Sequence, residues 1–391
     1  MSKQWLKSFT KTVLLSCLIL SVAACNQSPI RNPFAGRSEP KLAELPALTG
    51  ETAPAPKTVW TNGSLSKQER FTKIQPCVAG NIVYAADHSG KLIALNRDTG
   101  KKLWSRKTKK AFSAGPAFFD QTLFLTTQDA KVIAFDATNG KQKWEAKVSS
   151  EVLGTPAVRD GVVVISAIDG SVTGLSTQNG NSLWTVLQST PSLSLRYSSA
   201  PVIAGEKALV GLSSGKLLAI NLQNGLIEWE RVISLPRGRS ELQRMVDISA
   251  DPILNNDVVY VITYQGKLAA VEVSSGNLIW ERDISSYQNM ASDPEHLFIT
   301  DNDRHLWAID KQTGTTFWKQ LSLADRYITG PAVVDDKLVV GDRGGFVHFI
   351  QPSNGQLLSR AKVVGKSYQA PISMGNEAII MGHNGKLVVI R

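Results

Sequence analysis

The stretch Gly90–Trp104, GKLIALNRDTGKKLW, decides the fold that this sequence predicts. It contains an apolar run, a turn with a glycine, and a second short run that ends in tryptophan. Variants of it recur along the 391-residue chain at a spacing of about 40 residues, which is typical of a propeller or another repeat array. Because one copy is too small to bury a core, any function must belong to the assembled array.

Each repeat reads as four short strands joined by hairpin turns. Strands of this length, with turn signals at short intervals, are typical of a sandwich or a propeller, and the 40-residue period favours the propeller. The glycine of the last turn supplies the positive φ that a tight hairpin needs. Tryptophan stands at the same position in successive copies, and in the next copy Leu358-Ser359 stand there instead. The tryptophans are Trp60, Trp104, Trp144, Trp184, Trp229, Trp280 and Trp318. We expect these tryptophans to be core residues that cover the gaps between neighbouring blades.

The number of strands indicates how the ring closes. Eight copies of the first three strands are present, but only seven are followed by a complete fourth strand, because the eighth copy ends at Arg391. The missing strand is found at the other end, in Lys57–Thr61, KTVWT. The prediction is therefore an all-β, eight-bladed β-propeller over residues 57–391, with four-stranded antiparallel blades and the last blade closed by the N-terminal strand.

The first residues have the pattern of an export signal. A basic segment with three lysines precedes the apolar run Thr12–Val22, which is too short to span a bilayer but suits a signal peptide. The run ends in VAAC, which resembles a bacterial lipobox, so we expect residues 1–24 to be removed and Cys25 to be lipidated; plain secretion is the alternative. Residues 25–56, rich in Pro, Ser and Ala, are predicted to be a lipidated N-terminus and flexible tether. Asn26, which follows Cys25, resembles the residue that directs a bacterial lipoprotein to the outer membrane.

Composition gives little support for catalysis. Charged residues make up 19% of a globular chain, and removing residues 1–24 lowers the net charge from +10 to +7. Cys77 then has no cysteine partner, and it reads as a small buried hydrophobe because no nucleophile motif surrounds it. The histidines show no paired metal-ligand spacing, and Asp301–Asp303 reads as a turn. The basic cluster Lys101–Lys110 is better explained as a solvated face or a contact with anionic lipid than as a nucleic-acid site.

Two insertions depart from the regular spacing. Successive tryptophans are 45 residues apart from Trp184 to Trp229 and 51 apart from Trp229 to Trp280, and the excess lies in the connections 187–200 and 233–250. Consecutive blades are neighbours, so both loops should lie side by side on one face. Long loops on a rigid scaffold are where binding usually occurs, although an ordinary insertion is the alternative. The candidate contact residues in these loops are Leu193, Leu195, Arg196, Arg237, Arg239, Glu241, Arg244 and Asp247.

The A-x-D-x-x-T-G-x-x-x-W pattern resembles quinoprotein-type (PQQ-like) propeller repeats. Together with the lipobox, the tether, the eight blades and the segment SLSLR at 192–196, it resembles the BamB family, lipoproteins of the outer-membrane β-barrel assembly (BAM) complex. The resemblance implies a non-catalytic scaffold without a cofactor, lipid-anchored at the periplasmic face of the outer membrane, that assists insertion of β-barrel proteins. It implies that Leu193, Leu195, Arg196 and Asp247 bind the periplasmic POTRA domains of BamA; Ser249 stands where the family pattern can have a second acid. Nascent outer-membrane proteins are a further expected partner.

Two other functions remain open at this point. A PQQ-dependent dehydrogenase would share the fold, but those enzymes carry adjacent cysteines and an acidic calcium-binding site, and this sequence has neither. A periplasmic scaffold for another partner, or one that pairs with unfolded β-strands at a sheet edge, would need no site chemistry at all.

Overall fold

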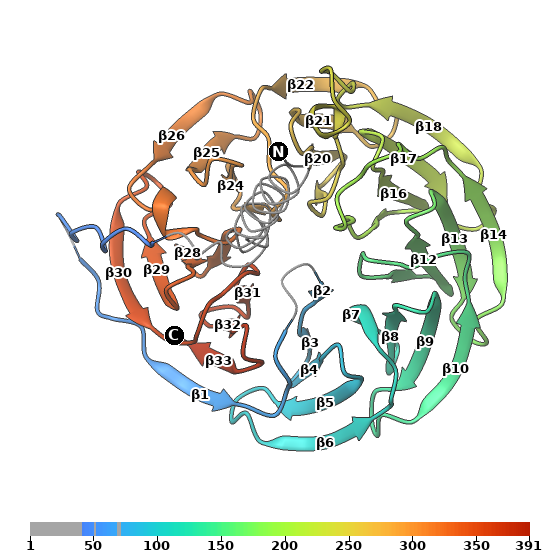
Figure 1. Ribbon diagram of the computed structural model, residues 1–391, viewed down its shortest axis with the longest axis horizontal. Helices are drawn as coiled ribbons and strands as arrows, with labels where there is room; N and C mark the ends of the chain where they lie inside the picture. The colour runs from blue at the N-terminus through green and yellow to red at the C-terminus, as the bar shows by residue number, and fades with distance from the viewer. Residues whose placement is uncertain (1–40, 51, 69–71) are drawn as a thin grey trace, which may run out of the picture. The chain divides into compact units, whose positions relative to one another are not determined.

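The computed structural model describes residues 41–50, 52–68 and 72–391, and residues 42–391 form one compact unit. Within this unit, eight antiparallel sheets follow one another around a ring (Figure 1), as predicted. Each blade begins with a short inner strand and ends with an outer strand. Blade 1 holds β3 (Cys77–Ala79), β4 (Ile82–Ala86), β5 (Lys91–Asn96) and β6 (Lys102–Lys107), and blade 2 holds β7 (Phe112–Phe119), β8 (Thr122–Thr127), β9 (Lys131–Asp136) and β10 (Gln142–Lys147). Blade 3 holds β11 (Ala157–Arg159), β12 (Val162–Ser166), β13 (Ser171–Ser176) and β14 (Ser182–Leu187), and blade 4 holds β15 (Val202–Ala204), β16 (Lys207–Gly211), β17 (Lys216–Asn221) and β18 (Ile227–Val232).

The second half of the ring repeats the same order. Blade 5 holds β19 (Ile253–Asn255), β20 (Val258–Ile262), β21 (Leu268–Glu272) and β22 (Leu278–Arg282), and blade 6 holds β23 (Ala291–Ser292), β24 (His296–Thr300), β25 (Leu306–Asp310) and β26 (Thr316–Gln320). Blade 7 holds β27 (Ala332–Val334), β28 (Lys337–Gly341), β29 (Phe346–Ile350) and β30 (Leu357–Lys362), and blade 8 holds β31 (Ile372–Ser373), β32 (Ala378–Met381), β33 (Leu387–Ile390) and β1 (Thr58–Asn62). An additional short strand, β2 (Lys73–Ile74), pairs in parallel with β7 at the inner side of blade 2 (Figure 1).

The middle strands are buried on both faces because each blade packs between two others. β12, VVVIS, is buried at all five positions, whereas the outer strand β14 is mostly exposed around its buried Trp184. In every outer strand the register shifts at the residue before the tryptophan position, as between Gln142 and Trp144. Such a β-bulge twists the edge of a sheet and makes it a poor template for another strand.

The regular spacing of tryptophan and glycine is explained by the junctions between blades. Each of the seven tryptophans of the repeat register donates a hydrogen bond from Nε1 to a backbone carbonyl of the next blade, as from Trp144 to Thr177 O at 2.8 Å. Its ring covers the glycine of that blade's last turn, where an added Cβ at Gly180 would lie 2.6 Å from the ring. The tryptophans are therefore structural, as expected. The seven donors and acceptors are Trp60–Arg97, Trp104–Ala137, Trp144–Thr177, Trp184–Leu222, Trp229–Val273, Trp280–Lys311 and Trp318–Pro352.

The ring closes as the strand count predicts. β1 pairs antiparallel with β33, with Thr58 opposite Ile390 and Asn62 opposite Leu387. Blade 8 consequently has no hairpin turn before its outer strand, and Lys57 and Arg391 exchange backbone hydrogen bonds at that position instead. Blade 7 therefore faces no hairpin turn that a tryptophan could cover, which explains why Leu358-Ser359 stands in that register.

The residues before β1 lie along blade 7. The N–H of Ala53 donates to Leu358 O at 3.0 Å, and Arg360 Nη1 donates to Pro46 O at 2.5 Å. Arg326 Nη1 donates to Ala43 O at 2.6 Å. The described part of the predicted tether thus makes specific contacts with the propeller; the domain bounds of the tether stay a prediction. Cys25 lies outside the described residues.

The helices in the described ranges are short. η2 (Leu242–Arg244) and η3 (Ala324–Arg326) have three residues each, and none of the described helices has the length and apolar character needed to cross a membrane.

Candidate docking face and pocket

The loops 187–200 and 233–250 lie side by side, as the sequence predicts. The N–H of Leu195 donates to Asp247 Oδ1 at 2.8 Å, and Ser192 Oγ donates to Glu241 Oε2 at 2.7 Å. We call the surface formed by these two loops the docking face. Its two loops join consecutive blades, so they emerge at the same end of the ring and support each other.

Apolar and cationic side chains are exposed on the docking face. Leu193 is 38% exposed, and Leu235 and Leu242 of the second loop are more than 60% exposed. The Arg196 side chain is 68% exposed, and its Nη2 donates to both carboxylate oxygens of Glu151 at 2.8 and 2.9 Å. This ion pair orients the guanidinium while leaving much of it accessible. Exposed leucines next to an oriented arginine are typical of a protein-binding surface.

Asp247 has a different role from the other predicted contact residues. Its side chain is only 2% exposed, so it cannot form much of a surface. Burial raises the pKa of Asp247 to about 6, although the hydrogen bond from the Leu195 N–H acts in the opposite direction. Oδ2 has no hydrogen-bond partner among the described atoms. Asp247 therefore holds the loop 187–200 in position from its buried side, and Leu193 and Arg196 form the exposed surface of that loop.

The position of Ser249 is also buried, and its carbonyl takes part in a contact across the ring. Lys73 Nζ donates to Ser249 O at 2.7 Å and forms an ion pair with Asp251 Oδ1 at 2.6 Å. Asp251 also accepts from the Ala200 N–H and from Asn289 Nδ2, both at 2.6 Å. Because Lys73 is on β2 beside blade 2, this network connects blade 2 to the connections before blades 4, 5 and 6.

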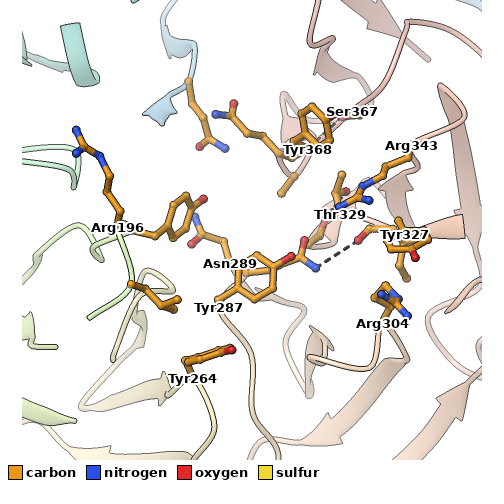
Figure 2. Close-up of a pocket in the computed structure, with 18 of the residues that line it drawn as sticks. Arg196, Tyr264, Tyr287, Asn289, Arg304, Tyr327, Thr329, Arg343, Ser367 and Tyr368 are labelled. Carbon is orange, nitrogen blue, oxygen red and sulfur yellow. Dashed lines mark hydrogen bonds between the residues drawn. The ribbon is translucent and has the colours of Figure 1, made fainter. Parts of the chain in front are cut away.

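A pocket of about 450 Å³ lies next to the docking face (Figure 2). Ser194 to Tyr197 of the first loop belong to its wall, Gln75 comes from the segment between β2 and β3, and the rest comes from the connections and turns of blades 5 to 8. Five of the chain's seven tyrosines line it: Tyr197, Tyr264, Tyr287, Tyr327 and Tyr368. Three arginines (Arg196, Arg304 and Arg343) line it as well, and none of its described lining residues is Asp or Glu. We call it the tyrosine pocket.

Reasoning from sequence did not identify the tyrosine pocket. Four of its tyrosines recur at nearly the same place in the repeat, four or five residues before the inner strand of a blade: Tyr197, Tyr287, Tyr327 and Tyr368. Tyr264 lies instead in a turn inside blade 5. This recurrence in the connections was a signal in the sequence that pointed to a shared pocket, and closure of the ring brings the four side chains together.

Three potential metal ligands, Asp301, Asp303 and His305, approach one another to within 4.8 Å. Asp301 Oδ2 accepts from Trp307 Nε1 at 2.7 Å, and Asp301 Oδ1 accepts from the His305 N–H at 2.8 Å. These hydrogen bonds account for the turn that the sequence predicts at Asp301–Asp303.

The thiol of Cys77 is poorly suited to nucleophilic chemistry. Burial raises the pKa of Cys77 to about 12, so the thiol is protonated at neutral pH. It is the one cysteine in the described part of the chain, and it packs beside the core of blades 1 and 2.

An eight-bladed ring of tryptophan-locked repeats, with two cross-linked loops beside a tyrosine pocket, defines a β-propeller of the PQQ-like repeat class. The family model described as outer membrane protein assembly factor BamB matches residues 38–112 and 94–320. The chain is 46% identical over 330 residues to the protein of that name from Legionella pneumophila (strain Paris), covering 84% of this chain and 86% of that protein. It is 42% identical to the one from Pseudomonas aeruginosa, covering 97% and 98%. The chain belongs to the BamB family.

A solved structure supports the same fold. The crystal structure of BamB from Moraxella catarrhalis superposes with a TM-score of 0.79 at 22% identity, covering 86% of this chain and all of that one. At this identity the likeness establishes the propeller architecture, while family membership rests on the sequence relatives.

Proposed function

We propose that this protein is a non-catalytic scaffold lipoprotein of the outer-membrane protein assembly machinery, which binds the periplasmic POTRA domains of BamA through its docking face. The observation that carries the proposal is the geometry of Ser192–Arg196 in a chain of the BamB family. The segment is fastened from below at Leu195 by the buried Asp247, while Leu193 and Arg196 remain exposed above it. A preformed loop loses little conformational entropy on binding, which favours a stable contact.

The chemistry of the residues supports a scaffold more than an enzyme. A PQQ-dependent dehydrogenase needs carboxylates to hold calcium, and the described residues of the tyrosine pocket include no Asp or Glu. Cys77 has a protonated thiol and no cysteine neighbour in the described chain. The function proposed is therefore recognition and orientation of other proteins, with delivery of nascent β-barrel chains as its purpose.

The proposed location follows from the N-terminal sequence. Acylation of Cys25 would anchor the protein through several acyl chains, at about 0.8 kcal/mol per buried CH₂. Residues 26–56 would then connect the anchor to the propeller at the periplasmic face of the outer membrane. Labelling with radioactive palmitate tests this step, since Cys25→Ser should abolish incorporation of label.

Co-purification with BamA tests the docking face. The triple variant Leu193→Ala/Leu195→Ala/Arg196→Ala should lose most of the BamA that the parent retains, because it removes the apolar contacts and the guanidinium together. A matched control is Leu183→Ala/Arg159→Ala, which removes a leucine that is 50% exposed and an arginine whose side chain is 51% exposed, near the opposite end of blade 3. If the folded triple variant retained as much BamA as this control, the docking face would not be the contact surface.

The enzyme alternative has its own assay. Addition of PQQ, calcium, an alcohol and a dye acceptor to the purified protein should give no turnover above that of the same mixture without the protein. Turnover that requires all four components would support the dehydrogenase function instead.

A further inference from the structure

The excess positive charge of the chain is concentrated in two neighbouring blades. Residues 77–147, which form blades 1 and 2, hold twelve Lys and Arg against six Asp and Glu, a net charge of +6. The chain from Cys25 onward has a net charge of +7, so all its other residues together contribute only +1. One side of the ring therefore carries a positive field, while the rest of the chain is close to neutral.

Most of these cations lie on the outer wall of the ring. The outer strands β6 and β10 follow each other along the rim (Figure 1). Arg106 Nε donates to Asn139 O at 2.8 Å, which connects β6 to the turn before β10. We call this surface the basic wall. Its exposed basic residues are Lys101, Lys102, Arg106, Lys107 and Lys109 of blade 1 and Lys141, Lys143 and Lys147 of blade 2.

The charge of the basic wall is not balanced by acids on the same strands. β6 contains no acid, and Glu145 is the one acid of β10. Glu145 is already bound by Lys110 Nζ at 2.7 Å and by Lys131 Nζ at 2.9 Å, and neither lysine belongs to the basic wall. The ion pairs of the described residues include none of the eight cations of the wall, so their charges remain available to a partner.

The composition of the basic wall suits the surface of an anionic bilayer. Seven of its eight cations are lysines, which attract negative charge without the bidentate geometry of arginine. Leu103 is 53% exposed between these charges, and an apolar side chain among cations is typical of segments that rest at the bilayer interface. None of the eight cations lines the tyrosine pocket. The wall thus offers an extended surface and not an enclosed site for a small anion.

The proposed anchor would keep a membrane within reach of the basic wall. The eighteen residues 25–42 can span at most about 60 Å. A surface held within that distance is present at a high effective concentration, so even a weak contact would be occupied. This step rests on the acylation of Cys25 that is proposed above.

We propose that the basic wall binds the surface of a bilayer that contains anionic phospholipid, with its lysines near the phosphate groups and Leu103 at the level of the headgroups. The docking face lies at one end of the ring, whereas the basic wall lies on its circumference. With the wall on the membrane, the docking face would point along the membrane and not toward it. The propeller would thus have a membrane contact of its own besides the lipid anchor.

Cosedimentation with vesicles tests the proposal on the full mature chain carrying Cys25→Ser, which cannot be acylated. It should bind vesicles of equal parts phosphatidylcholine and phosphatidylglycerol at least tenfold more tightly than vesicles of phosphatidylcholine alone. Raising the salt concentration from about 0.01 M to about 1 M should abolish this preference, because the Debye length falls from about 30 Å to about 3 Å.

Two charge reversals locate the contact. Lys102→Glu/Lys107→Glu should lower the affinity for phosphatidylglycerol vesicles at least tenfold. The matched control is Arg159→Glu/Lys362→Glu, which makes the same change in net charge at exposed residues of blades 3 and 7 and should lose less than threefold. If the first variant failed to fold, Lys102→Gln/Lys107→Gln would replace it, with a loss of at least threefold expected.

A fluorescent label shows which surface meets the bilayer. Leu103 and Leu183 each precede a tryptophan of the repeat and are 53% and 50% exposed. In a Cys25→Ser/Cys77→Ala background, an environment-sensitive dye on Leu103→Cys should shift to the blue on phosphatidylglycerol vesicles. The same dye on Leu183→Cys should not shift.

Three results would overturn the proposal. The first is equal affinity for the two kinds of vesicle, and the second is an equal loss in the wall variant and its control. The third is a shift of the label at position 103 with polyglutamate as large as that with vesicles, which would assign the basic wall to an acidic protein. These assays contain neither an acyl chain nor BamA, so their outcome is separate from the palmitate and co-purification results.

Discussion

The N–H of Leu195 and the carboxylate of Asp247 are joined by a hydrogen bond of 2.8 Å between residues 52 apart in the sequence. This contact joins the exposed loop 187–200 to the buried base of the loop 233–250, and the hydrogen bond from Ser192 to Glu241 joins the same two loops at the surface. The carboxylate has one partnered oxygen and one without a partner among the described atoms, and burial raises its pKa to about 6. The hydrogen bond between the two loops therefore depends on whether the Asp247 carboxyl group is protonated.

Asp247→Asn should stabilise the protein at pH 8 and not at pH 4. With a folded pKa near 6 and an unfolded pKa near 3.8, the folded state binds the extra proton, so ionisation of Asp247 opposes folding as pH rises through 6. The amide keeps an acceptor for the Leu195 N–H and removes this cost, which is at most about 3 kcal/mol. Thermal melting of both proteins at pH 4 and pH 8 measures the effect. A benefit that is equal at the two pH values would contradict the assignment.

The same substitution separates positioning from direct contact. If Asp247 acts by holding the loop, Asp247→Asn should retain BamA in the co-purification assay, whereas Asp247→Ala should retain clearly less. If the charge of Asp247 touches the partner, both variants should lose binding alike. Equal loss would return Asp247 to the contact surface.

Substitution of a glycine under a tryptophan should cost more than substitution of an exposed turn glycine. Gly180 has φ +75° and an added Cβ there would lie 2.6 Å from the Trp144 ring, whereas Gly161 has φ +81° and no neighbour within 4 Å of an added Cβ. Gly161→Ala should cost about 1–2 kcal/mol for the left-handed backbone alone. Gly180→Ala should cost that amount and a further 1–3 kcal/mol for overpacking. Chemical unfolding compares the two; equal losses would mean that the tryptophan contact adds nothing.

The ion pair between Lys73 and Asp251 should contribute to stability across the ring. Lys73 is 4% exposed, and burial lowers its pKa, although Asp251 acts in the opposite direction. Lys73→Met should lower the free energy of unfolding by about 1–3 kcal/mol, because Asp251 loses a partner in a partly buried site. A double-mutant cycle with Asp251→Asn measures the coupling, and additivity of the two changes would show that the pair is not coupled.

Acid should destabilise blade 7 through Asp342. Burial raises the pKa of Asp342, but hydrogen bonds from His348, Phe346 N–H and Arg326 lower it to a net value below the usual range. A carboxyl with a depressed folded pKa contributes stability above its unfolded pKa, near 3.8, and loses it as pH falls through the folded value. Asp342→Asn should therefore lower the melting temperature at pH 7, and the difference from the parent should shrink as the pH falls below 3.8. A difference that is constant with pH would contradict this origin.

The repeat made most of the architecture predictable. The repeated tryptophans, glycines and apolar runs predict the strands and turns of each blade from short stretches of sequence. The eighth copy lacks a fourth strand of its own, which predicted that β1 pairs with β33, as observed. The adjacency of the two loops was also predictable, because consecutive blades are neighbours. The burial of Asp247 was not, since nothing in its local sequence distinguishes a loop carboxylate at the surface from one beneath a second loop.

Long-range contacts account for what the sequence did not reveal. The Lys73 ion pair joins residues 178 apart, and Arg360 binds Pro46 across 314 positions. Prolines and alanines in 42–56 are compositionally typical of a linker, yet their carbonyls accept hydrogen bonds from blade 7. Contacts through backbone carbonyls leave no signature in side-chain composition.

The pairing of β1 with β33 also orders events during synthesis. β1 is the first propeller strand made, and its partner is the last, with Thr58 opposite Ile390. Until β33 has been made, β1 has no sheet to join. Trp60 can then contact Gly100 of blade 1 only from a strand that is not yet part of a blade. Closing a loop of this length is slow relative to forming a hairpin. A growing chain must therefore keep β1 unpaired until β33 has been made, and a chain that ends before β33 leaves β1 without the strand it pairs with.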